Sequence, residues 1–106
     1  MPGTKWSAEE LTLALKLYFT TPYLKISKKD RRLMELSSIL NRSPGAVYAK
    51  LGNFARLDPE MKKLKVRGLE NGGKLDIIIW DRYSDDLHSL SRDAEAILQK
   101  RKKTVA

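Results

Sequence analysis

The chain has 106 residues, of which 42% are hydrophobic and 32% charged, with a formal net charge of +8 and no cysteine. This length and composition predict one folded domain with a modest core, and the missing cysteines exclude disulfides, thiolate nucleophiles and thiolate metal sites. No signal peptide is recognisable and no apolar run could span a bilayer, so we expect a cytoplasmic protein with no membrane partner.

The excess of basic residues predicts a polyanionic partner, because each phosphate that Lys or Arg neutralises releases condensed counterions. The cations form three clusters, namely Lys28, Lys29, Arg31 and Arg32, then Lys62, Lys63, Lys65 and Arg67, and finally Lys100, Arg101, Lys102 and Lys103. Any one cluster is equally compatible with a solvated surface. Three clusters together favour a nucleic acid.

The first helix is predicted to begin after Ser7, which has Glu10 three residues later, as in a capping box. Trp6 can close over this helix start as a hydrophobic staple. Proline disfavours helical geometry at the residue before it, so the helix should end near Thr20, two residues before Pro22. Its apolar stripe comprises Leu11, Ala14, Leu15 and Tyr18, widened by Leu13 and Leu17.

The next two predicted helices are separated by only a short turn. Ser27 and Asp30 form a weaker capping signal for the second helix, and Ser43 with Pro44 predicts the N-cap and first residue of the third. Two helices joined in this way predict a helix-turn-helix. The apolar face of the second helix comprises Leu33, Leu36, Ile39 and Leu40.

The third helix, about 44–56, has one unusually small face. At about 100° per residue, Val47, Leu51 and Phe54 point to one side, and small residues with one amide and one cation point to the other. Such a face suits a helix that enters the major groove, although close helix packing also favours Gly and Ala, and that alternative stays open. The small face comprises Gly45, Ala46, Ala49, Gly52, Asn53 and Arg56.

These positions define the predicted DNA contacts. Arg42 and Ser43 should hold a phosphate at the N-terminus of the third helix, and Asn53 and Arg56 should face bases or the groove wall. The alternative for Asn53 is a hydrogen bond within its own helix end or the following turn. Tyr48 and Lys50 flank the face, and the predicted backbone contacts are Lys28, Lys29, Arg31, Lys63, Lys65 and Arg67.

The remaining segments of the expected fold lie between residue 58 and the C-terminus. Asp58 with Pro59 predicts a short helical turn, residues 70–73 predict a loop, and residues 64–69 are either an extended arm or irregular. From Asp76 onward, apolar spacings of three and four predict one long amphipathic helix, whose seam could pack on Leu13 and Leu17 or dimerise. That seam comprises Trp80, Tyr83, Leu87, Leu90, Ala94 and Ile97.

We therefore expect an all-α domain over residues 1–106, with a core at about 6–98 and a basic tail at 99–106. It would consist of a helix-turn-helix three-helix core and a long C-terminal amphipathic helix. Asp81, Asp85 and His88 have a spacing that could gather a metal ion, but a solvated acidic face is the commoner use of this pattern. No phosphate loop or nucleophile–base pair is recognisable, so we predict no catalysis, cofactor or metal.

The run "LALKLYFTTPYLKISKKDRRLMELSSILNRSPGAVYAKLGNFARLDP", followed by "RGLENGGKLDIIIWDRYSDDLHSL", resembles the N-terminal DNA-binding region of predicted HNH-type restriction endonucleases. The most specific elements are Arg42-Ser43-Pro44, Lys50-Leu51, Asn53-Phe54-Ala55 and Leu57-Asp58-Pro59. Less specifically, the Trp6 start and the order of three helices are similar to Myb-like domains. The resemblance implies a module that brings a nuclease to DNA, with modified DNA as one candidate target.

The nuclease itself does not carry over, because a single histidine cannot build a His-Asn-His metal site. The partner expected from the sequence is double-stranded DNA, and a homodimer or a fused or separate nuclease is compatible with it. The alternative function is a protein-interaction adaptor or inhibitor that docks through the small face of the third helix. The net charge of +8 favours DNA.

Overall fold

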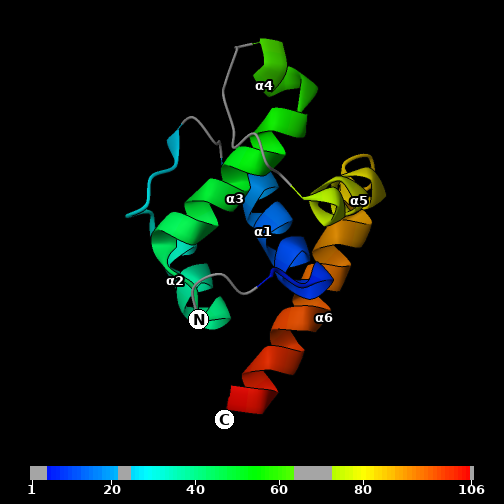
Figure 1. Cartoon of the computed structure of the whole chain (residues 1–106). Helices are drawn as coiled ribbons and strands as arrows, with labels where there is room; N and C mark the ends of the chain where they lie inside the picture. Colours follow the sequence, from blue (N-terminus) through cyan, green and yellow to red (C-terminus); the bar gives the residue numbers. More distant parts are fainter. Residues whose placement is uncertain (1–4, 22–24, 64–72, 106) are drawn as a thin grey trace.

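The computed structural model describes residues 5–21, 25–63 and 73–105. For residues 62, 63 and 103–105 it describes the backbone and not the side chains. Over the described residues all regular secondary structure is helical and no strand occurs, which confirms the all-α prediction. The helices are α1 (Ala8–Thr20), α2 (Arg31–Leu40), α3 (Pro44–Leu57), α4 (Pro59–Lys63), α5 (Lys74–Tyr83) and α6 (Leu87–Val105) (Figure 1).

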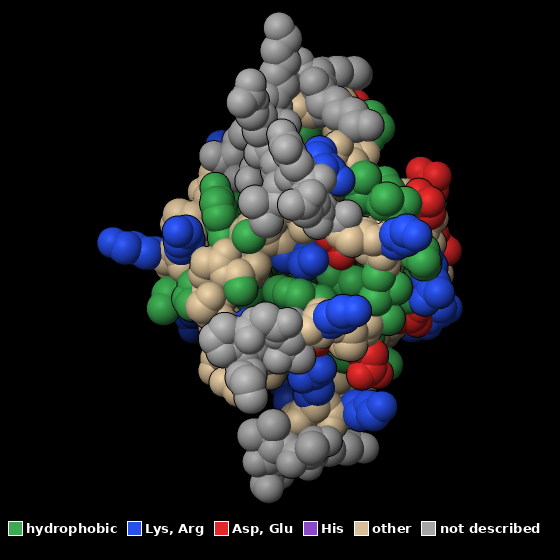
Figure 2. Space-filling view, in the orientation of Figure 1, with side chains coloured by type: hydrophobic (Ala, Val, Ile, Leu, Met, Phe, Trp, Pro, Cys, Tyr) green, Lys and Arg blue, Asp and Glu red, His purple; other side chains and the backbone are tan. Residues whose placement is uncertain are grey.

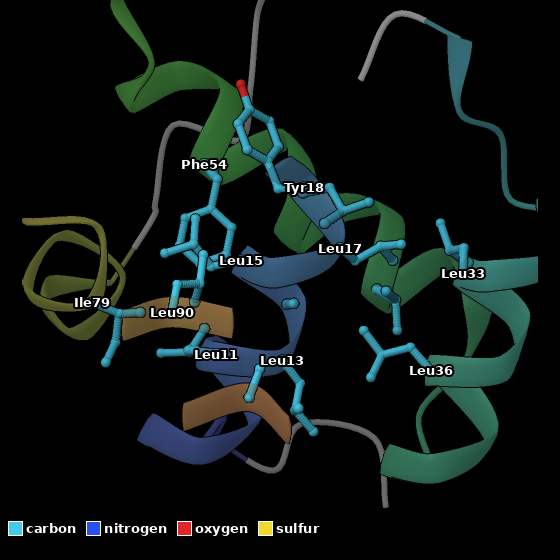
Figure 3. Close-up of a cluster of buried hydrophobic side chains, with 14 of the residues drawn as sticks. Leu11, Leu13, Leu15, Leu17, Tyr18, Leu33, Leu36, Phe54, Ile79 and Leu90 are labelled. Carbon is cyan, nitrogen blue, oxygen red and sulfur yellow. The ribbon is translucent and has the colours of Figure 1, made fainter. Parts of the chain in front are cut away.

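Helix α1 lies at the centre of the fold and contacts α2, α3, α5 and α6. It is buried on nearly every side, which is typical of a helix whose apolar residues extend around its circumference. Figure 3 shows Leu11 and Leu15 on the side of Ile79 and Leu90, whereas Leu17 lies on the side of α2. Leu17, one of the two α1 positions predicted to pack against the C-terminal helices, therefore lies on the side of α2 instead.

An aromatic cluster joins α1, α3 and α5. Trp80 lies with its ring centroid 5.9 Å from that of Tyr18 and 6.4 Å from that of the fully buried Phe54. The Tyr18 hydroxyl donates a 2.6 Å hydrogen bond to Asp58 Oδ2, which ties the core to the end of α3. A buried tyrosine needs such an acceptor for its hydroxyl, so Asp58 has a structural role beyond starting α4.

Local capping signals account for most helix starts. The Ser7–Glu10 capping box is confirmed, with hydrogen bonds of 2.9 and 3.1 Å, and Ser43 caps α3 by accepting from the amide of Ala46. The N-cap of α2 is Asp30 and not Ser27, because the Asp30 carboxylate accepts from two backbone amides of the first turn. At the other end of α2, Asn41 adopts the left-handed conformation (φ 54°) that begins a turn at 41–43.

The prediction of one long C-terminal helix is wrong, because the chain breaks at residues 84–86 into α5 and α6. Asp86 ends the continuity by capping the new helix, accepting from the amide and the hydroxyl of Ser89. Tyr83, Leu90 and Ala94 are buried in the chain's own core, as the intramolecular alternative predicted, whereas Leu87 is exposed.

The apolar face predicted for α2 is only partly buried. Ile39 is exposed, although the sequence pattern placed it with the buried leucines of α2. Within the ranges that the structure describes, no helix is both long and apolar enough to cross a membrane.

Candidate nucleic-acid interface

The two halves of α3 have different surroundings. In the first half, Gly45, Ala46, Tyr48 and Ala49 are partly exposed, and a Cβ added to Gly45 would meet only the Ser43 hydroxyl, at 3.9 Å. In the second half, every residue from 51 to 55 is buried. The small face predicted for the whole helix is therefore accessible over its first two turns and at Arg56, whereas Gly52 and Asn53 are covered.

Asn53 and Gly52 are buried, which corrects their predicted placement on an outward face. Asn53 is only 5% exposed, and its side-chain amide donates a 3.1 Å hydrogen bond to Asp76 Oδ2 in α5. Among the described residues this side chain makes no hydrogen bond to its own helix end, and its burial removes it from the outward face on which a base contact was predicted. The amide links α3 to α5 in this conformation.

Arg42 forms a partly buried ion pair with Glu10, although the sequence placed it on a phosphate. Its guanidinium donates to both Glu10 oxygens, at 2.8 and 3.0 Å, and to the carbonyl of Lys5 at 3.1 Å. Both side chains of the pair are 11% exposed. The pair joins the start of α1 to the turn before α3.

The electrostatics of this pair depend on opposing effects. Burial raises the pKa of Glu10, but hydrogen bonds from Arg42 and from the Ser7 amide outweigh it, so the net pKa lies below its ordinary value. The hydrogen bond to Glu10 in turn raises the pKa of Arg42. Both groups are therefore held in their charged forms.

Trp6 lies between Arg42 and Lys50 and contacts the core. The Arg42 Cζ atom is 4.5 Å from the ring centroid of Trp6, and Lys50 Nζ is 5.4 Å from the same centroid. Lys50 also forms a 3.2 Å ion pair with the buried Asp76. The structure thus brings Arg42 and Lys50 together around one indole, as parts of an internal network rather than an open cationic face.

The basic segment, residues 25–32, brings five exposed cations together within eight residues. Its two acidic neighbours are engaged locally, because Asp30 caps α2 and Glu35 pairs with Arg31 at 3.3 Å. Figures 1 and 2 place residues 25–30 and exposed basic side chains at the left edge of the view. The exposed cations are Lys25, Lys28, Lys29, Arg31 and Arg32, of which the predicted contacts omitted Lys25 and Arg32.

The other predicted contacts are less accessible or lie outside the description. Arg56 is partly exposed, like Ala49, and Ser43 is exposed at the start of α3. Lys63 ends α4 but its side chain is not described, and Lys65 and Arg67 lie outside the described residues. In the tail, Lys100 pairs with Glu9 at 3.6 Å, Arg101 is partly buried and Lys102 is exposed.

The alternative metal set does not come together in the described parts of the chain. Asp81, Asp85 and His88 are exposed, and no group of three or more potential His, Asp or Glu ligands is close enough to hold a metal ion among the described residues.

Sequence signals for the internal network existed only in part. Glu10 was recognised as a capping residue, but nothing local indicated that its carboxylate would also hold Arg42, 32 residues away. Asp76 gave no signal at all beyond its place at the start of a helix.

Compared with family models, curated proteins and solved structures, the chain has no match in any of the three.

Proposed function

We propose that the chain is a non-catalytic, double-stranded DNA-binding module in which α2, the turn at 41–43 and α3 act as a helix-turn-helix. The first two turns of α3 enter the major groove, and the basic segment contacts the sugar-phosphate backbone. The observation that carries the proposal is the basic segment itself, with five exposed cations leading into the helix that packs against α3.

The start of α3 supports this docking on steric grounds. Its partly exposed residues Gly45, Ala46 and Ala49 carry little or no side chain, so the helix backbone can approach base edges and groove walls. Ser43 caps the helix at its positive dipole end, where a phosphate is favoured. This region replaces Asn53 and Gly52 as the proposed recognition surface.

The charges of the basic segment support backbone contacts. Within the described residues, Lys25, Lys28, Lys29 and Arg32 form no ion pair, so their charges are available to phosphate. Such contacts position a protein on the duplex and carry no sequence information of their own. Any association with a restriction system remains a prediction of the resemblance alone.

We expect the chain to bind a short DNA duplex with an affinity that falls steeply as salt rises. Replacing Lys28 and Lys29 together with glutamine should weaken binding to all duplexes and flatten the plot of log affinity against log salt. The slope should change by about 0.9 for each phosphate that the variant no longer neutralises. Fluorescence anisotropy over a salt series measures both the affinity and the slope.

The matched control removes two exposed cations from α5 and α6, as Arg82→Gln with Arg92→Gln. Because the net charge changes equally, this control should leave the slope close to that of the parent. A parent that fails to bind duplex DNA even at low salt would overturn the proposal and favour the adaptor function. Equal weakening of DNA binding in both double variants would show that the basic segment is not the contact surface.

The proposed groove contact predicts that Ala49→Leu weakens DNA binding and leaves the fold intact. Ala49 is partly exposed, so added bulk should lift α3 from the groove while changing the free energy of unfolding by no more than about 0.5 kcal/mol. Gly52→Leu is the contrasting variant, because Gly52 is buried and overpacking costs about 1–3 kcal/mol. Thermal unfolding and anisotropy on the same samples separate the two effects.

An Ala49→Leu variant that binds DNA like the parent would show that this part of α3 does not contact the groove.

A further inference from the structure

The outer face of α5 carries two adjacent exposed isoleucines. Ile77 is 42% exposed and Ile78 is 51% exposed, whereas Ile79 and Tyr83 on the opposite side of the helix are buried in the core. Over α5, at the right of the view, Figure 2 shows hydrophobic side chains beside both acidic and basic ones. The two neighbouring isoleucines form a small exposed apolar patch on this ten-residue helix.

The charges on the same face are arranged symmetrically about the isoleucines. Lys74 precedes Ile78 by four positions and Asp81 follows Ile77 by four positions, so all four residues lie on one side of the helix. Lys74 and Asp81 are exposed, and neither forms an ion pair within the described residues. The face is therefore complementary to itself when a second copy is turned end for end.

We propose that α5 is a dimerisation surface on which two copies of this chain pack antiparallel around a two-fold axis between Ile77 and Ile78. The axis brings each Ile77 against the Ile78 of the second copy, and each Lys74 against the Asp81 of the second copy. Such an interface is isologous, because every contact occurs twice. The two exposed isoleucines supply the apolar centre and the two ion pairs fix the register.

The charge balance of this face favours a second copy over a polyanion. On this face the exposed cation Lys74 is matched by the exposed anion Asp81, although the whole chain carries a net charge of +8. Two copies that meet through this face therefore avoid the repulsion that the net positive charge would otherwise cause. The surface proposed here is not the a/d seam that the sequence pattern indicated. Tyr83 and Leu90 of that seam are buried inside one copy and are not available to a second.

The size of the interface determines the expected strength. One ten-residue helix per copy buries less surface than a standard interface of about 1,600 Å², so the dimer should be weak and concentration-dependent. The dimer proposal does not rest on the proposed DNA binding. Its test uses the chain without DNA, so either proposal can fail while the other holds.

Sedimentation equilibrium on the full chain, over a wide concentration series, should show a reversible monomer–dimer equilibrium. Ile78→Asp should raise the dimer dissociation constant at least about tenfold, because it places a charge in the apolar centre. Met34→Asp is the matched control: Met34 is 49% exposed on α2 and should leave the equilibrium unchanged. Circular dichroism of each variant verifies that it is folded.

Charge reversal tests the antiparallel register. Lys74→Glu alone and Asp81→Lys alone should each abolish dimerisation, because each places like charges opposite each other. An equimolar mixture of these two variants should recover it as a heterodimer, and the double variant should recover it as a homodimer. Lys102→Glu is an exposed charge control away from α5.

A chain that stays monomeric at every concentration would overturn the proposal, as would equal effects of Ile78→Asp and Met34→Asp. Dimerisation that survives the single reversals, or that neither the mixture nor the double variant restores, would show that α5 does not pair in this register.

Discussion

Replacing Arg42 with alanine is expected to lower the free energy of unfolding by about 3 kcal/mol, because it leaves the Glu10 carboxylate without its partner in a largely buried position. The guanidinium donates twice to Glu10 and also binds the Lys5 carbonyl, so the substitution removes these hydrogen bonds. It also removes the cation that lies over Trp6. Denaturant unfolding at neutral pH measures the decrease in stability.

The same pair makes stability depend on pH in a definite direction. Because the folded-state pKa of Glu10 lies below its ordinary value of 4.5, the pair's contribution is fully present above pH 4.5. It is lost as the pH falls through the lowered pKa and Glu10 takes up a proton. The difference in stability between the parent and Arg42→Ala should therefore narrow on acidification.

Arg31→Ala is the matched control for this experiment. The ion pair between Arg31 and Glu35 has side-chain exposures of 92% and 62%, so its removal should change the free energy of unfolding by less than about 1 kcal/mol. A decrease in Arg42→Ala no larger than this would contradict a structural role for Arg42. Arg42 would then be available for the phosphate contact that the sequence predicted.

Replacing Asp76 with alanine is expected to cost a similar amount, about 3 kcal/mol, because two polar groups lose their shared acceptor. Lys50 approaches the Asp76 carboxylate at 3.2 Å and is itself only 14% exposed. The Asn53 amide donates to the same carboxylate, while Asn53 Oδ1 is buried without a hydrogen bond. Chemical unfolding of Asp76→Ala measures the combined effect.

Two further variants separate the loss of a charge partner from the loss of packing. Removing both charges, as Lys50→Met with Asp76→Leu, should be less destabilising than Asp76→Ala, because no unpaired charge stays buried. Asp85→Ala removes an exposed carboxylate that follows α5 and should change stability by no more than about 0.5 kcal/mol. Equal stabilities of Asp76→Ala and Asp85→Ala would show that Asp76 is not needed as an acceptor.

These two ion pairs explain why the predicted recognition residues differ from the accessible ones. Arg42, Lys50 and Asn53 have the side chains expected of a DNA-reading helix, and residue type alone cannot distinguish that use from an internal network. Their partners, Glu10 and Asp76, lie 32, 26 and 23 residues away in the chain. The acidic residues beside the basic segment have only local partners, because Asp30 accepts from the amide of Arg32 and Glu35 pairs with Arg31.

The sequence by itself determined the features that depend on neighbouring residues. The Ser7–Glu10 capping box, the Ser43–Pro44 helix start and the all-α class follow from hydrogen bonds and side-chain spacing within one or two turns. Only the tertiary structure decided which side of α3 is covered, whereas the break at 84–86 coincides with a local cap, Asp86 on Ser89, that the apolar periodicity did not reveal. Helical periodicity defines the faces of a helix, but their exposure depends on elements packed from distant parts of the chain, as Asp76 on α5 covers Asn53.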